Sequence, residues 1–65
     1  MDFEDVEEGK YYRIQTIWGT DNIFYIKRRD KYSKHIICLK DGDFSNIQIL
    51  IPYSEIANIE KIERW

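Results

Sequence analysis

The chain has few of the residues from which small proteins build cross-links and catalytic centres. Its 65 residues include one cysteine, one histidine, one proline and three isolated glycines. A single cysteine excludes an internal disulfide and an all-cysteine zinc site. No apolar run approaches the roughly 18 residues of a membrane-spanning helix, and the first residues are acidic where a secretory signal peptide would be basic. We therefore expect a cytoplasmic protein that makes no membrane contact.

No group of side chains in the sequence predicts an enzyme. A cysteine–histidine nucleophile pair requires contact between the two side chains. His35 and Cys38 are three residues apart on one expected strand, so they should point to opposite faces. Asp41 and Asp43 lie in an expected turn, where aspartate is favoured for its hydrogen bonds to the backbone. The sequence therefore predicts a non-enzymatic protein with neither a metal nor a cofactor.

The composition favours strands over helices. Isoleucine is the most common residue, with twelve copies, whereas Ala57 is the only alanine. Isoleucine and tyrosine favour strands, and alanine favours helices. A chain of this length suffices for one small domain only. We expect a single all-β domain over residues 1–65, in which the acidic lead-in of residues 1–9 either caps one end of the sheet or frays.

Hydrophobic alternation and turn signals predict five short strands. Residues 10–18 and 23–29 alternate: Tyr12, Ile14, Thr16 and Trp18 share one face of the first expected strand, and Phe24 and Ile26 should point inward in the second. Residues 35–40 form the third expected strand, followed by an aspartate–glycine turn signal. Residues 47–51 are apolar at nearly every position, so the fourth strand should be the most buried.

Two structures are compatible with the segment after Pro52. The first is a 3₁₀ turn near residues 53–57 followed by a strand over residues 59–64. The second is a short helix over residues 55–64, capped by Ser54. We favour the strand, because a fifth strand helps so small a sheet to curl and close.

The end of the chain resembles that of SH3-like barrels. The segment Ile51-Pro52-Tyr53-Ser54-Glu55-Ile56, followed by Ile59, is similar to their strand, single 3₁₀ turn and short closing strand. Gly9-Lys10-Tyr11-Tyr12-Arg13-Ile14 is similar to their first strand. The resemblance implies a small five-stranded SH3-like or Sm-like barrel over residues 9–64. It transfers no functional residues, because the peptide-binding signature of eukaryotic SH3 domains and the RNA-holding pattern of Sm-like proteins are both missing.

Charge is segregated along the chain although the net charge is only −2. Residues 1–9 carry −5, residues 10–40 carry +6 and residues 41–65 carry −3. The densest basic stretch lies within an expected hairpin at residues 25–36. Basic side chains neutralise phosphates, and an exposed aromatic ring stacks on a base. We therefore expect contact with nucleic acid or a nucleoprotein complex, with seven candidate residues: Tyr25, Lys27, Arg28, Arg29, Lys31, Tyr32 and Lys34.

Other interpretations of the same features stay open. The basic hairpin is also compatible with a solvated edge that resists strand pairing. It is also compatible with contact to an acidic protein surface, as in a small phage-type or mobile-element protein that modulates a host protein. Homo-oligomerisation is plausible for either, because strand edges are hard to hide at this size. An aromatic recognition surface is a further hypothesis, made of Tyr11, Tyr25, Tyr32 and Tyr53.

Strand alternation also indicates which basic side chains of the hairpin are the better candidates for phosphate contact. It places Arg28 on the inward face with Phe24 and Ile26. Arg29 and Lys31 lie beyond the expected end of the strand, so we expect them to face solvent and to be the better candidates for phosphate contact.

Overall fold

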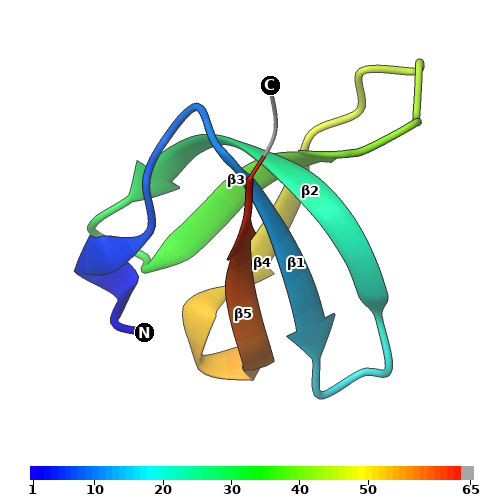
Figure 1. The fold of residues 1–65 in the computed structure, drawn as a ribbon. Helices are drawn as coiled ribbons and strands as arrows, with labels where there is room; N and C mark the ends of the chain where they lie inside the picture. Colours follow the sequence, from blue (N-terminus) through cyan, green and yellow to red (C-terminus); the bar gives the residue numbers. More distant parts are fainter. Residues whose placement is uncertain (64–65) are drawn as a thin grey trace.

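The strands of residues 1–63, the part of the chain that the computed structural model describes, form one antiparallel sheet (Figure 1). The strands are β1 (Tyr11–Thr16), β2 (Asp21–Asp30), β3 (His35–Lys40), β4 (Ile49–Pro52) and β5 (Ile56–Ile62), in the spatial order β4-β3-β2-β1-β5. Two 3₁₀ turns, η1 (Phe3–Asp5) and η2 (Tyr53–Glu55), are the only helical segments in residues 1–63. Neither has the length and apolar character needed to cross a membrane. The predicted all-β class is confirmed.

The segment after Pro52 is a 3₁₀ turn and a strand, as favoured from the sequence, and not a helix. β5 begins directly after η2 and pairs with β1, where Ile14 lies opposite Ile59. β5 ends at Ile62, and Arg64, the last residue of the expected strand, lies outside the described residues. β4 and β5 form the two edges of the sheet, and no strand pairing joins them within residues 1–63. The sheet is strongly curved and stays open between these two edge strands (Figure 1).

Alternating side chains of the central strands build the core on the inner face. Phe24 and Ile26, which alternation predicts to point inward, are buried, and so are Tyr12, Ile14 and Thr16, which share one face of β1. The full cluster consists of Phe3, Val6, Tyr12, Ile14, Phe24, Ile26, Ile36, Cys38 and Ile51. Burial raises the pKa of the Cys38 thiol to about 12, so Cys38 is a protonated packing residue.

The acidic lead-in packs against one end of this core. Phe3 and Val6 are both buried in the cluster. The Glu7 backbone N–H donates a hydrogen bond to the Tyr12 hydroxyl at 2.9 Å, and the Gly9 N–H donates to the Ile26 carbonyl at 2.7 Å. The two apolar side chains and these two hydrogen bonds hold residues 1–9 onto β1 and β2.

The prediction that the fourth strand is the most buried is wrong. β4 begins at Ile49, and Ile47 and Leu50 are 65% and 57% exposed, whereas Ile51 is fully buried. β4 is an edge strand with one face in the core, so its alternate side chains meet solvent. β3, which lies between β2 and β4, is more buried than β4 and buries three consecutive residues, Ile36–Cys38.

A β-bulge at Lys27 reverses the expected alternation at the end of β2. Ile26 lies opposite Cys38, but the next pair along the ladder is Arg28 with Ile37, so Lys27 is the extra residue. Arg29 is then opposite the buried Ile36, on the inner face. The prediction that Arg28 shares the face of Phe24 and Ile26 is therefore wrong.

Candidate functional site

The seven residues predicted to form a site do not share one surface. Lys27 is exposed at the bulge, and Arg28 is exposed on the outer face opposite Ile37. Tyr25 lies in the middle of β2, where it pairs with Tyr11 of β1. The remaining four surround the β2–β3 turn: Arg29, Lys31, Tyr32 and Lys34. We refer to these four residues as the hairpin tip.

Arg29 connects the hairpin tip to the acidic lead-in. Its guanidinium carbon lies 5.6 Å from the centroid of the Phe3 ring, and its Nη1 donates a hydrogen bond to the Phe3 carbonyl at 3.0 Å. Its backbone N–H donates to the Glu8 carboxylate at 2.9 Å. The Arg29 Nε is buried and has no hydrogen-bond partner among the described residues. Arg29 is therefore half-buried, and the expectation that it faces solvent is wrong.

Three basic side chains of the hairpin tip line one cavity. Arg29, Lys31 and Lys34 surround a hollow of ≈ 280 Å³ together with Phe3 and Glu4 of η1. The three cations outnumber the single carboxylate, so the cavity is electropositive and suits an anionic group.

The turn that carries these side chains is held by Asp30. Its carboxylate accepts hydrogen bonds from the backbone N–H groups of Tyr32 at 3.0 Å and Ser33 at 3.4 Å. Hydrogen bonding from Ser33, followed by that from Tyr32, lowers the pKa of Asp30, so its carboxylate is charged at neutral pH. The turn presents the Tyr32 side chain entirely to solvent, while Lys34 has a positive φ of 55°.

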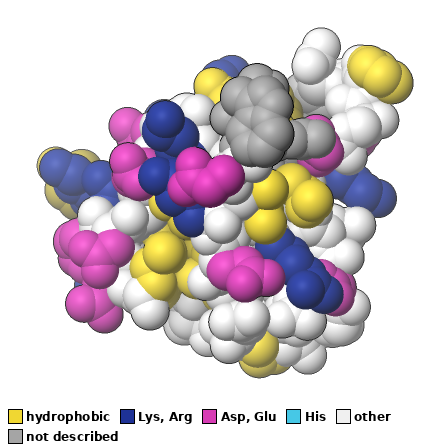
Figure 2. All heavy atoms as spheres, in the orientation of Figure 1, with side chains coloured by type: hydrophobic (Ala, Val, Ile, Leu, Met, Phe, Trp, Pro, Cys, Tyr) yellow, Lys and Arg dark blue, Asp and Glu magenta, His cyan; other side chains and the backbone are white. Residues whose placement is uncertain are grey.

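The two bases of β1 and β5 are both paired with acids. Arg13 Nη2 lies 2.8 Å from the Asp21 carboxylate, and Arg13 also pairs with Glu60. Lys61 pairs with Glu7 at 2.7 Å. On the face of the described residues that Figure 2 shows, acidic and basic side chains are interspersed accordingly. Of the bases in residues 10–40, Arg29, Lys31 and Lys34 belong to the hairpin tip, while Lys10, Lys27, Arg28 and Lys40 are exposed elsewhere.

A second surface lies on the outer face of the sheet. The register places Tyr11 directly opposite Tyr25, with ring centroids 5.3 Å apart and ring planes at 59°. Tyr25 in turn lies opposite Leu39, and Tyr11 lies opposite Ile62. These four residues form an apolar row across β5, β1, β2 and β3.

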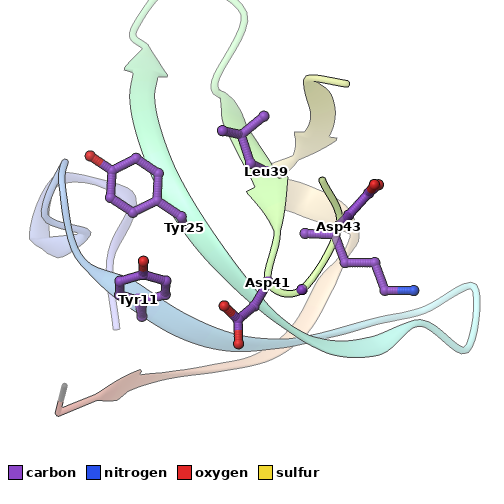
Figure 3. A pocket seen from close by; sticks show the side chains of 7 residues that line it. Tyr11, Tyr25, Leu39, Asp41 and Asp43 are labelled. Atoms are coloured by element: carbon purple, nitrogen blue, oxygen red, sulfur yellow. The ribbon is translucent and has the colours of Figure 1, made fainter. Parts of the chain in front are cut away.

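The turn after β3 closes one side of this row and creates a hollow. The hollow has a volume of ≈ 230 Å³, with Tyr11 and Tyr25 on one side and Leu39, Asp41 and Asp43 on the other; the Asp41 carboxylate lies beside the rings, whereas the Asp43 carboxylate points away from them (Figure 3). Lys40 and Gly42 complete the lining. We call it the tyrosine hollow.

Of the four tyrosines expected to form an aromatic surface, only two come together. Tyr53 packs edge-to-face on Phe3, with centroids 5.5 Å apart, and its hydroxyl donates a hydrogen bond to the Met1 carbonyl. Tyr32 stands alone at the hairpin tip. Alternation placed Tyr25 on the face opposite Phe24 and Ile26, but only the register shows that Tyr11 is its neighbour. The sequence did not single out Leu39 and Phe3, which line the two cavities.

Comparison of the chain with protein-family models, curated proteins and solved structures found no match. Within residues 1–63, no three His, Cys, Asp or Glu side chains are grouped so that they could hold a metal ion. The chemistry of the two surfaces is therefore the basis for assigning a function.

Proposed function

We propose that the protein is a non-enzymatic module that binds single-stranded nucleic acid through the hairpin tip. The observation that carries this proposal is the convergence of Arg29, Lys31 and Lys34 on one cavity beside the fully exposed ring of Tyr32. A phosphate in the cavity would meet three cations. A neighbouring base would stack on Tyr32, and base–aromatic stacking contributes about 1–3 kcal/mol per base.

The exposure of Tyr32 favours a single strand over a duplex. A base can stack on a protein ring only when its face is not already covered by neighbouring base pairs. The hairpin tip also offers only one turn of chain, and it has no helix or long ribbon to place in a major groove. We therefore expect weak sequence preference and strong dependence on salt.

The architecture supports the same proposal. We propose that the curved sheet is a small barrel of the SH3-like or Sm-like type, because a single 3₁₀ turn separates its two edge strands β4 and β5. Small β-barrels commonly bind oligonucleotides across a strand face and its loops. The fold alone does not determine function, so the charges and the ring of the hairpin tip carry the assignment.

The test is a titration of a fluorescent twelve-nucleotide oligothymidylate at several salt concentrations. Lys31→Ala/Lys34→Ala should bind more weakly, and its slope of log K against log salt should be shallower by about 0.7 for each phosphate that the variant no longer neutralises. Tyr32→Ala should weaken binding at every salt concentration without changing the slope, because it removes a stacking partner and no charge.

The matched control for the charge change is Lys10→Ala/Lys40→Ala. Both lysines are exposed and lie outside the hairpin tip. This control should retain the affinity and the salt slope of the wild type, apart from a small long-range effect. Equal binding by the two double variants would overturn the assignment to the hairpin tip.

An exposed apolar stretch supports a second candidate function, docking on a host protein. Phe44, Ile47 and Leu50 are large apolar residues that are more than half exposed along the loop before β4 and in β4 itself. Exposed apolar surface of this kind marks protein contacts. A stoichiometric complex that survives size exclusion in about 0.5 M salt, where charge contacts are screened, and that does not form with Phe44→Ser would favour this candidate.

A further inference from the structure

The tyrosine hollow lies at the opposite end of β3 from the hairpin tip. The hairpin tip precedes His35, the first residue of β3, whereas the hollow is lined by Leu39 and by the turn that follows Lys40. Its two carboxylates would repel a phosphate backbone, so the hollow does not extend the proposed nucleic-acid site.

We propose that the tyrosine hollow binds an arginine side chain presented by a partner protein. The observation behind this is a pair of tyrosine rings beside the Asp41 carboxylate in one small depression, with Asp43 on the same turn (Figure 3). Tyrosine ring faces attract cations, and arginine is the cation most often found in such contacts.

The pair of tyrosine rings is organised before any ligand arrives. Tyr11 and Tyr25 project from paired strands, and both side chains are half-buried. Their centroids are only 5.3 Å apart, so the rings contact each other and a guanidinium would lie over the pair rather than between the rings. Leu39, opposite Tyr25, extends the apolar surface on which the aliphatic stem of an arginine would lie.

The turn that borders the hollow carries fixed negative charge. Hydrogen bonds from the Ser45 hydroxyl at 2.7 Å and the Ser45 backbone N–H at 2.9 Å hold the Asp43 carboxylate in place. These hydrogen bonds lower the pKa of Asp43, which is therefore ionised at neutral pH. The Asp41 backbone N–H donates to the Ile23 carbonyl at 2.9 Å, which ties the turn to β2. Two carboxylates and Lys40 leave the lining with a net charge of −1.

The size and shape of the hollow favour one arginine over other ligands. A volume of ≈ 230 Å³ is below the roughly 300 Å³ at which pockets for drug-sized ligands begin, so one side chain is a suitable occupant. A planar guanidinium can stack on tyrosine and donate hydrogen bonds to a carboxylate at the same time. A lysine ammonium is more strongly hydrated and has no flat face to stack.

The test is a nuclear magnetic resonance titration of the ¹⁵N-labelled protein with three blocked tripeptides: Gly-Arg-Gly, Gly-Lys-Gly and Gly-norleucine-Gly. The arginine peptide should shift the amide signals of Tyr25, Leu39 and Gly42 in a saturable manner. The lysine peptide should bind about two- to fivefold more weakly, and the norleucine peptide should cause no saturable shift.

Two variants assign the binding to the hollow. Tyr25→Leu keeps apolar bulk but removes the ring face, and Asp43→Asn removes one charge. Each should weaken the arginine peptide about two- to fivefold. Tyr32→Leu, at the other end of β3, is the matched control and should bind the peptide like the wild type. If Tyr25→Leu does not fold, Asp43→Asn and the comparison of peptides still decide the question.

Three results would overturn the proposal. Equal binding of the norleucine and arginine peptides would show an apolar site rather than a cation site. Shifts of the same amides by the oligothymidylate would place the hollow in the nucleic-acid site. Concentration-dependent shifts of these amides in the free protein would identify a second copy of the chain as the occupant. Failure of the oligothymidylate to bind at all would refute the proposed function and leave this site unaffected.

Discussion

The guanidinium of Arg29 lies over the ring of Phe3, with 5.6 Å between the guanidinium carbon and the ring centroid, and Nη1 donates to the Phe3 carbonyl. This contact joins the most basic segment of the chain to its most acidic one. It keeps one cation of the hairpin tip in position, and it also makes Arg29 part of the packing that holds the lead-in.

Replacement of the two neighbouring arginines should therefore have unequal effects on stability. Arg29→Ala removes a charged hydrogen bond and a cation–π contact, so we expect the free energy of unfolding to fall by about 1–3 kcal/mol. Arg28→Ala, on the exposed outer face, should change the free energy of unfolding by less than about 0.5 kcal/mol. Urea unfolding of both variants provides the comparison, and a larger decrease in Arg28→Ala would contradict the bulged register.

The Tyr12 hydroxyl should contribute to stability through the lead-in. The Tyr12 side chain is fully buried, and its hydroxyl accepts the Glu7 backbone N–H at 2.9 Å. Tyr12→Phe leaves that N–H without its acceptor, at an expected cost of about 1 kcal/mol. Tyr32→Phe, at a fully exposed position, should unfold at the same urea concentration as the wild type. Equal midpoints for the two variants would show that residues 1–9 do not depend on this hydrogen bond.

Stability should decrease in acid, and Asp21 should account for part of the decrease. Hydrogen bonding from Arg13 lowers the pKa of Asp21 in the folded state, whereas the unfolded chain has an ordinary aspartate pKa of about 3.9. The contribution of Asp21 is therefore present above that pH and disappears as the pH falls through the lower folded pKa. Asp21→Asn should be less stable at pH 7, and its stability curve should approach that of the wild type in acid. A constant difference from pH 7 to about pH 2 would exclude this role for Asp21.

The Cys38 thiol should be unreactive in the folded protein. Burial raises its pKa to about 12, and its Sγ lies 3.6 Å from the Ile49 carbonyl as a weak hydrogen-bond donor. Only the thiolate attacks disulfide reagents. We expect the native protein to react with an aromatic disulfide reagent at pH 8 only as fast as it unfolds, and the urea-unfolded chain to react at once. Rapid reaction of the native protein would show that β4 opens from β3.

Alternation made the inner face of β1 and β2 predictable. Tyr12, Ile14, Phe24 and Ile26 follow a period of two, as the residues of a regular strand with one face in a core do up to the bulge at Lys27. The short fifth strand was predictable for a related reason, because Pro52 ends the preceding strand and a small sheet gains from another strand at its edge.

The same reasoning from alternation gave a wrong prediction for the burial of the apolar run before Pro52. Gln48 is the only polar residue between Ile47 and Ile51, so the run has no alternation that would indicate an exposed face. Whether such a run is central or at an edge depends on its neighbours in the sheet, and those are set by the order in which strands pair.

The sequence by itself determined the all-β class, the five strands, the inward direction of Phe24 and Ile26 and the block of basic charge. These depend on local side-chain chemistry and on a period of two, both of which are visible within a few residues. Only the tertiary structure decided that the bulge at Lys27 turns Arg29 inward and that Tyr11 meets Tyr25 and Leu39 across three strands. Register and bulges result from contacts between residues far apart in the chain, so no local pattern specifies which side chains will share a cavity.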